Sequence, residues 1–326
     1  MRIFVTGATG FIGAHLCRAL VARGHELVAL VRDPAKAASE LPHERVETVR
    51  GDLSLFDRDD VVLPRCDLVI HLAGVVAAPT PDAYDAINYE AVRRLVRTLA
   101  RQSWQPRRFL FASSLAAAGP SATRAPKTER DPCEPIEPYG RAKHKAEQFL
   151  AAEAPFPTTS FRPSLVFGPR DTATLAFYKM AKRGVGFRVA GEPQQLSYID
   201  VDDAVAGIAA MATDASDAHR TYFLAARDVT DTEALWHAMS RALGRRVRVV
   251  RVPRPVLRGA SAATTALSKL FGFRNQLDAK QVDQMIAPAF VCSSDALQAA
   301  HGWTPKVSLD AALAKAWAAY RADGWL

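Results

Sequence analysis

The fold is decided by the segment Ile3-Phe4-Val5-Thr6-Gly7-Ala8-Thr9-Gly10-Phe11-Ile12-Gly13. An apolar run typical of a buried strand leads into glycines spaced G-x-x-G-x-x-G, and a helical pattern follows over Ile12–Ala22. Gly7 permits a tight turn, Gly10 lets the backbone approach a pyrophosphate, and Gly13 lets the helix pack close to the strand. The free N–H groups that begin the helix favour an anion. The segment therefore predicts a dinucleotide site with contacts at Gly7, Thr9, Gly10, Phe11, Ile12 and Gly13.

Strands and helices alternate through the first half of the chain. Strands are expected at Arg2–Val5, Glu26–Val31, Val46–Arg50, Leu68–His71, Arg108–Ala112 and Thr158–Arg162. Helices are expected at Ile12–Ala22, Tyr84–Arg101 and Tyr139–Ala152. This alternation predicts an α/β fold, in which a doubly wound parallel sheet of the Rossmann type carries a smaller C-terminal substrate lobe.

The regular alternation weakens after Val166, where prolines and a basic segment follow. We expect residues 1–166 to form the dinucleotide-binding domain and residues 167–326 to form mainly the substrate-binding lobe. Segments near 198–225 are expected to return to the main sheet, as a helix at Tyr198–Met211 and a strand at Thr221–Leu224.

The end of the second strand bears on which dinucleotide binds. An acid at this point binds the ribose hydroxyls of NAD, whereas an arginine accommodates the 2′-phosphate of NADP. Arg32 is the first residue beyond the strand, and Lys36 lies four residues later. Asp33 precedes Pro34, so we expect its carboxylate to cap the following turn rather than to face the ribose. NADP(H) is therefore expected to be preferred, with NAD(H) as the alternative.

Two other strand ends offer contacts to the same ligand. Asp52 follows the third strand, where it is placed to accept a hydrogen bond from adenine, and Leu53 lies beside it. The small residues after the fourth strand let the backbone approach the ligand, which adds Leu72, Ala73 and Gly74. His71, just before them, is expected to be a structural, hydrogen-bonded histidine.

Candidate catalytic groups lie at the start of one helix and at the end of one strand. Tyr139 and Lys143 are four residues apart, so they share a helical face. Ser113 and Ser114 follow the strand that ends at Ala112, at the edge where such sheets bind ligands. A tyrosine with its ordinary pKa of about 10 is a weak base at neutral pH, and nearby positive charge would lower that pKa. The constellation predicts proton transfer to or from a substrate oxygen.

Composition restricts the class of protein. The chain has 326 residues, of which 49% are hydrophobic and 23% charged, which is ordinary for a globular protein. Its four cysteines are widely separated and include no C-x-x-C pair, so neither a disulfide framework nor a metal site is expected. No signal peptide and no apolar stretch of transmembrane length is evident, which predicts a cytoplasmic protein.

The net charge of +8 is concentrated in residues 220–275, which hold eleven Arg or Lys and three acids. A solvated arginine-rich surface explains this distribution most simply. A contact with an anionic membrane or with a phosphate-bearing substrate is the alternative. Nucleic acid is not expected as a partner, because no recognition motif accompanies the charge.

The chain resembles the extended short-chain dehydrogenase/reductase superfamily, including its NAD-dependent epimerase/dehydratase-like members. The resemblance covers essentially the whole chain. The motifs that carry it are Thr6–Gly13, Gly51-Asp52-Leu53, His71–Gly74, Ser113-Ser114, Tyr139-x-x-x-Lys143, Arg162-Pro163-x-x-Val166-Phe167-Gly168-Pro169, Val201-Asp202-Asp203, His301-Gly-Trp-Thr-Pro-Lys306 and Gly324-Trp325-Leu326.

The resemblance implies an enzyme with a Ser-Tyr-Lys proton-transfer site. Tyr139 would exchange a proton with the substrate oxygen, Ser114 would position that oxygen, and hydride would pass between nicotinamide and substrate. Lys143 would lower the tyrosine pKa and bind the nicotinamide ribose. Pro163 would pack near the nicotinamide, and Asn88 corresponds to an asparagine that we expect to be structural. Members of the superfamily often pair two helices into a homodimer, whereas the sequence itself leaves the oligomeric state open.

The branch of the superfamily is indicated by two departures from the nucleotide-sugar enzymes. Those enzymes usually have an acid where this chain has Arg32, and an arginine just before the tyrosine of a stretch that here is Gln195-Leu196-Ser197-Tyr198. The stretch from Asp278 to Cys292 looks more like the 3β-hydroxysteroid dehydrogenase-like members, and flavonoid-reductase-like members are also similar. We therefore expect an apolar small-molecule ketone or alcohol as substrate. The alternatives are a nucleotide-sugar epimerase or dehydratase with tightly bound NAD, and a non-catalytic cofactor-binding scaffold.

Overall fold

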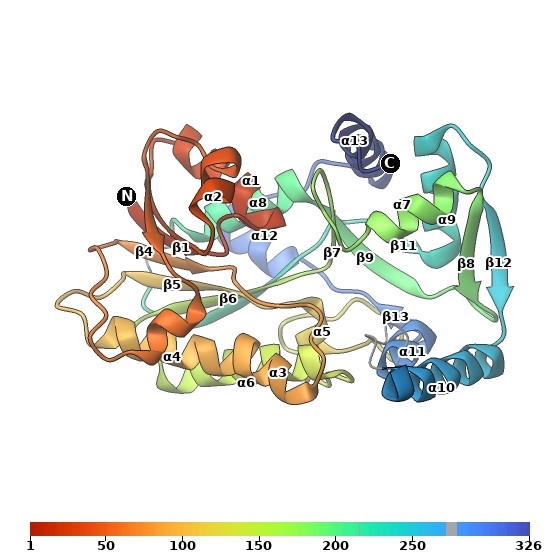
Figure 1. Cartoon of the computed structure of the whole chain (residues 1–326), viewed down its shortest axis with the longest axis horizontal. Helices are drawn as coiled ribbons and strands as arrows, with labels where there is room; N and C mark the ends of the chain where they lie inside the picture. The colour runs from red at the N-terminus through yellow and green to blue at the C-terminus, as the bar shows by residue number, and fades with distance from the viewer. Residues whose placement is uncertain (215, 272–278) are drawn as a thin grey trace.

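The computed structural model describes residues 1–214, 216–271 and 279–326. Its centre is a seven-stranded sheet in the order β10-β6-β5-β4-β1-β2-β3, in which every neighbouring pair is parallel (Figure 1). The strands of this sheet are β1 (Arg2–Thr6), β2 (Glu26–Val31), β3 (Val46–Arg50), β4 (Leu68–His71), β5 (Arg108–Ala112), β6 (Thr158–Pro163) and β10 (Arg220–Leu224). The predicted α/β class with a Rossmann-type parallel sheet is confirmed.

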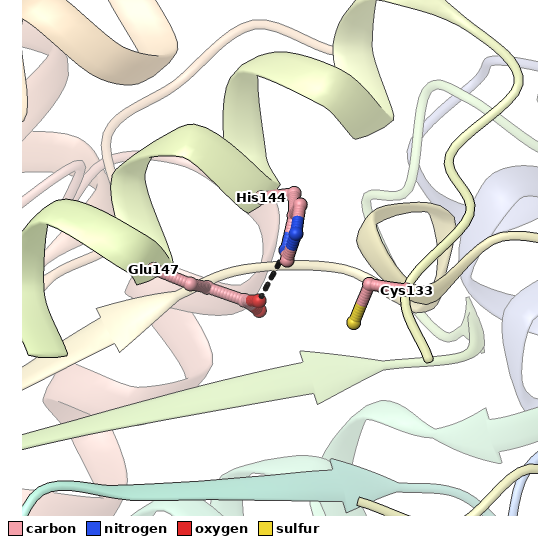
Figure 2. Close-up of side chains that lie close together, drawn as sticks. All are labelled: Cys133, His144 and Glu147. Atoms are coloured by element: carbon pink, nitrogen blue, oxygen red, sulfur yellow. Dashed lines mark hydrogen bonds and ion pairs between the residues drawn. The ribbon is translucent and has the colours of Figure 1, made fainter. Parts of the chain in front are cut away.

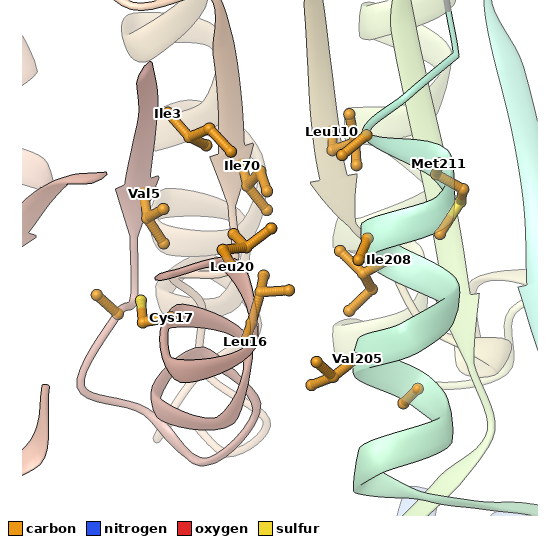
Figure 3. Packing of buried hydrophobic residues seen from close by; sticks show 14 of the residues in the cluster. Ile3, Val5, Leu16, Cys17, Leu20, Ile70, Leu110, Val205, Ile208 and Met211 are labelled. Carbon is orange, nitrogen blue, oxygen red and sulfur yellow. The ribbon is translucent and has the colours of Figure 1, made fainter. Parts of the chain in front are cut away.

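Helices cover both faces of the main sheet because successive strand residues point to opposite sides. On one face, strand residues share one core with α1 (Phe11–Ala22) and α8 (Val201–Met211); in Figure 3 Ile3 and Val5 lie beside α1, and Leu110 lies beside α8. On the other face, Phe4 packs in a core with α4 (Ala91–Ala100) and α6 (Pro138–Glu153). The shorter helical segments around this sheet are α2 (Pro34–Glu40), η1 (Leu53–Asp57), α3 (Pro81–Asp85), η2 (Ala86–Glu90), α5 (Leu115–Ala118) and α12 (Asp295–His301).

The C-terminal lobe has smaller sheets and its own core. Its larger sheet is formed by β7 (Leu165–Phe167), β9 (Gln195–Asp200), β11 (Val229–Asp231) and β13 (Ala289–Phe290). A parallel ribbon is formed by β8 (Val185–Val189) and β12 (Arg248–Val252). The helices of the lobe are α7 (Leu175–Lys182), α9 (Thr232–Leu243), α10 (Arg254–Phe271), α11 (Ala279–Ile286) and α13 (Leu309–Ala322). No helix in the described part of the chain has the length and apolar character that crossing a bilayer requires.

Two predicted elements differ from the structure. The helix expected over Tyr198–Met211 begins only at Val201, because residues 195–200 form the central strand of the lobe's sheet, and Asp200 caps the helix by accepting from the Asp202 N–H. The helix expected over Tyr84–Arg101 contains a π-helical turn at Ala86–Glu90. Asp278, and Arg274 within the basic segment at residues 220–275, lie outside the described residues.

Candidate active site

The glycine turn after β1 forms a cradle open at the start of α1. Gly7 has φ +74°, and a Cβ there would lie 2.7 Å from the Ala73 nitrogen. A Cβ on Gly13 would lie 2.1 Å from the Gly7 oxygen, so the helix could not approach the turn this closely with any side chain. No side chain caps α1, and its first turn contains no acid. The turn therefore fits an anionic pyrophosphate, which would receive the helix N–H groups.

The end of β4 contacts the end of β1, where the glycine turn begins. His71 is fully buried, shares a hydrogen bond of 2.7 Å between its Nδ1 and the Thr6 Oγ1, and stacks on Phe109 and Phe111. Burial, and secondarily the charge of Lys143, lower the pKa of His71 to about 3. The imidazole is therefore neutral at physiological pH, in agreement with a structural role.

The small residues after His71 bring backbone close to the catalytic candidates. A Cβ on Gly74 would lie 2.7 Å from the Asn88 Oδ1 and 3.1 Å from the Lys143 Nζ. Asn88 is fully buried and binds the backbone of Val75 twice, accepting from its N–H at 3.1 Å and donating to its carbonyl at 2.9 Å. These two hydrogen bonds hold Gly74 against Lys143. They give Asn88 a structural role, as expected.

The candidate ribose-binding region lies beyond β2 and β3. Asp33 accepts hydrogen bonds from the N–H groups of Ala35 and Lys36, at 2.9 and 3.2 Å, and thereby caps α2. The expectation that this carboxylate serves as a cap is confirmed. Arg32 is exposed, and its charge contributes to the low pKa of Asp52, after the larger effect of hydrogen bonds from Ser54.

The other predicted dinucleotide contacts lie along the same carboxyl edge of the sheet. Thr9 and Gly10 lie in the turn after β1, and Leu72 and Ala73 follow β4. Phe11 and Ile12 begin α1, Leu53 begins η1, and Pro163 ends β6. The structure thus brings all the predicted contacts to one edge of one sheet, from segments more than a hundred residues apart in sequence.

Ser114, Tyr139 and Lys143 come together between β5 and α6. Ser114 caps α5 by accepting from the Ala116 N–H at 3.2 Å, and its hydroxyl is also hydrogen-bonded to Tyr139. Lys143 is 3% exposed and donates from Nζ to the Ala112 carbonyl at 2.7 Å. Because Ala112 ends β5, this bond ties the lysine of α6 to the strand that supplies the serine.

The protonation states follow from burial. Burial raises the pKa of Tyr139 to about 12, and the hydrogen bond from Ser114 offsets only part of that effect. Burial also lowers the pKa of Lys143 to about 7, opposed by the negative charge of Glu147. The resemblance implies that Lys143 lowers the pKa of Tyr139. In the protein without cofactor, burial instead raises the tyrosine pKa and lowers the lysine pKa, because it disfavours both charged forms. Tyr139 is a protonated phenol at neutral pH, which suits a proton donor.

A buried ion pair beneath Lys143 was not predicted from the sequence. Glu147 lies one helical turn after Lys143, and it accepts two hydrogen bonds from Arg162, at 2.8 and 2.6 Å. Both side chains are 6% exposed. Glu147 and Arg162 lie on different elements, so the sequence does not show that they pair. It does show that Lys143 and Glu147 share one helical face.

Figure 2 shows Glu147 with His144 and Cys133, whose ligand atoms lie within 4.8 Å of one another. This set has the chemistry of a metal site, but Arg162 also donates to the Cys133 sulfur at 3.0 Å. A guanidinium therefore occupies the position between thiol and carboxylate that a cation would need. The arrangement is better described as a polar cluster that fixes Arg162 and Glu147.

A cavity of about 970 Å³ opens from the catalytic candidates into the C-terminal lobe. Ser114, Tyr139 and Pro163 line it on the side of the main sheet. Its lobe side has apolar contributions from Phe177, Phe187, Val189, Leu196, Leu235, Trp236, Met285, Ile286 and Phe290, and polar ones from Arg188, Glu192, Gln194, Ser197, Thr232, Arg254, Gln281 and Gln284. The volume lies at the upper end of ligand pockets, which suits a bulky apolar molecule with its reactive group at Tyr139.

Comparison with known proteins agrees with this geometry. Residues 3–225 match the model of the NAD dependent epimerase/dehydratase family. The chain is 29% identical to ceramide reductase from Caulobacter vibrioides over 99% of its own length and 96% of that protein. It is 26% identical to a 3 beta-hydroxysteroid dehydrogenase/Delta 5-->4-isomerase from Mycobacterium tuberculosis, over 83% of this chain and 77% of that one. The crystal structure of gox2253 superposes with a TM-score of 0.78 at 26% identity, covering 99% and 98% of the two chains.

The chain belongs to the NAD dependent epimerase/dehydratase family, within the extended short-chain dehydrogenases/reductases. It is therefore an oxidoreductase of an NAD(P)-dependent enzyme family, and a nicotinamide dinucleotide is its expected cofactor. The uncapped start of α1 and the close approach of Gly7, Gly13 and Gly74 fit that group.

Proposed function

We propose that the protein is an NADP(H)-dependent oxidoreductase that acts on a carbonyl or hydroxyl of a largely apolar small molecule. The observation that carries this proposal is the position of Tyr139 and Ser114 in the lining of a large apolar cavity. In this assignment residues 1–166 bind the dinucleotide, and residues 167–326 provide most of the substrate site. The segment at 198–225 returns a strand, β10, to the main sheet.

The nicotinamide would supply or accept the hydride. The chain's own residues handle the proton and the orientation of the substrate. The Ser114 hydroxyl, fixed at the start of α5, holds the substrate oxygen next to Tyr139. Tyr139, protonated at neutral pH, donates its proton to that oxygen as the carbonyl is reduced. Lys143 is held by the Ala112 carbonyl, close to Gly74, where it can bind a ribose hydroxyl.

Lipid-like or steroid-like ketones are the substrate class that the cavity favours. The wall formed by Phe187, Leu235 and Trp236 gives a bulky apolar molecule a large contact surface, although polar side chains such as Glu192 and Gln194 also line the cavity. The names of two relatives, a ceramide reductase and a 3 beta-hydroxysteroid dehydrogenase, point to the same kind of molecule. Polyketide-like and aromatic ketones have similar polarity and belong to the same set.

The preference for NADP(H) rests on Arg32. The carboxylate of Asp33, the acid that would favour NAD, is committed to capping α2. Arg32 is exposed beyond β2, where its guanidinium can form bidentate hydrogen bonds with a 2′-phosphate.

An oxidation screen with NADPH and NADH tests the proposal. The panel holds long-chain keto lipids, 3-ketosteroids, cyclic ketones and quinone-like aromatics, with UDP-sugars as the contrasting class. We expect turnover with an apolar ketone, faster with NADPH, and slower by about two to four orders of magnitude in the Tyr139→Phe variant. Conversion of UDP-sugars with no turnover of any ketone would overturn the proposal in favour of an epimerase.

A further inference from the structure

One face of the β8–β12 ribbon continues the lining of the cavity out to solvent. The strands are parallel, with Val185 opposite Arg248 and Phe187 opposite Val250. Because side chains alternate along a strand, Val185, Phe187 and Val189 share a face, and Val250 lies on the same one. Phe187 and Val189 line the cavity, whereas Val185 is 43% and Val250 45% exposed. An apolar strip, with the exposed Arg248 beside Val185 on the same face, therefore leads from the cavity to the outer surface.

The segment beside this strip is cationic throughout. Residues 245–258 contain six arginines and no acid, and all six arginines are exposed. Within the described residues, Arg251 is the member of this set with an ion pair, to Glu233 at 3.4 Å. Arg254 lines the cavity, so the positive charge reaches its rim. We call this surface, residues 245–258 together with Val185, the arginine face.

The first turns of α10 complete the arginine face. Val256 is 58% exposed, and Pro255 and Arg258 beside it are exposed as well, whereas Leu257 is buried. Figure 1 shows α10 at the outer end of the lobe, below the β8–β12 ribbon and next to α11. Arg254, the first residue of α10, lines the cavity, so the exposed start of this helix lies at the cavity rim.

We propose that the arginine face docks on an anionic lipid bilayer, so that an apolar substrate enters the cavity directly from the membrane. Arginines separated by exposed valines and prolines match a surface of phosphates above acyl chains, where cations bind headgroups and apolar side chains enter the interface. The apolar strip gives a lipid a continuous path to Phe187, which it would lack if the cavity opened into a polar surface. The substrate part of this proposal rests on the proposed function, whereas the docking does not.

Vesicle binding by the full chain, without cofactor or substrate, tests the docking. The probes are sedimenting vesicles of phosphatidylcholine alone or mixed in equal parts with phosphatidylglycerol. We expect binding to the anionic vesicles and not to the neutral ones, with weakening as salt shortens the screening length. The double variant Arg248→Glu with Arg258→Glu should bind at least about 30-fold more weakly, from about 1 kcal/mol for each arginine.

The matched control is Arg23→Glu with Arg65→Glu, which changes the net charge equally. Both residues are exposed and precede strands β2 and β4, at the amino edge of the main sheet and far from the cavity. The control should bind vesicles as the wild type does, and both double variants should retain the wild-type Tm. If the glutamates prevent folding, Arg248→Gln with Arg258→Gln replaces them, with about half the effect on charge.

The failures of the two proposals are distinguishable. Equal loss of binding in both double variants, or no binding to anionic vesicles at low salt, would overturn the docking whatever the enzyme reduces. A shift in oligomeric state confined to the arginine-face variant, seen by sedimentation velocity, would assign the face to a second copy instead. Failure of every ketone in the screen would leave the vesicle result unaffected.

Discussion

Replacing Lys143 by methionine should make the protein more stable at neutral pH while removing its activity. Burial lowers the pKa of this amine from the ordinary 10.5 to about 7, and the side chain is 3% exposed. At about 1.4 kcal/mol per pH unit, keeping the amine buried costs the folded protein about 4 kcal/mol at pH 7. Losing the hydrogen bond to the Ala112 carbonyl destabilises the variant by about 2 kcal/mol, which offsets about half of the gain. Lys143→Met should therefore stabilise by about 2 kcal/mol.

The pH dependence of that gain is the sharper result. Between pH 7 and pH 10 the unfolded chain holds a proton at Lys143 that the folded chain has lost, so the penalty shrinks as pH rises. By pH 10 the penalty is below about 1 kcal/mol, and the variant should then be slightly less stable than the wild type. The assay is urea denaturation of both proteins without cofactor at pH 7 and pH 10, with exposed Lys145→Met as the matched control. An equal effect of Lys143→Met at both pH values would show that folding does not lower the pKa of the Lys143 amine.

Three further results follow from the same geometry. Arg32→Asp should reverse or abolish a preference for NADPH over NADH of about tenfold, or 1.4 kcal/mol, measured as dissociation constants, and tighter NADH binding by the wild type would contradict it. Glu147→Gln should lower the free energy of unfolding by about 3 kcal/mol, because Arg162 keeps a buried charge without its partner, and a change below about 1 kcal/mol would contradict that role. Because burial raises the pKa of Tyr139 to about 12, ketone reduction should hold constant through neutral pH while alcohol oxidation rises with pH, and an oxidation rate that is flat up to pH 10 would show that no phenolate is needed.

The strands of the main sheet were predictable because local features delimit them. The apolar runs Glu26–Val31 and Leu68–His71 end at turn-forming or small residues, and the structure has both strands with those bounds. The boundary at Asp200 was missed because Gln195–Asp200 leads into α8 without a glycine or proline. Sequence pattern alone does not show where such a strand stops when its last residue also caps the helix.

Some features of the candidate site were also predictable from sequence, and others depend on tertiary packing. Tyr139 and Lys143 could be paired from sequence because helical spacing brings them together. The pairing of Glu147 with Arg162 depends on how α6 packs on β6, which no local pattern encodes. The cavity was also hidden, because its walls come from segments between Val76 and Phe290 that meet only in the folded chain.

Proton transfer from Tyr139 is tested most directly by single-turnover reduction of the best ketone from the screen. Wild type and Tyr139→Phe are compared, with NADPH bound to each beforehand. The substitution removes the transferable proton and keeps the ring that lines the cavity. We predict that the rate falls by about two to four orders of magnitude. The dissociation constant of NADPH, followed by cofactor fluorescence, should change less than about threefold, since the lost hydroxyl acts on the substrate oxygen. A Tyr139→Phe variant that reduces the ketone within about tenfold of the wild-type rate would contradict proton transfer from Tyr139, and with it the assignment of this site.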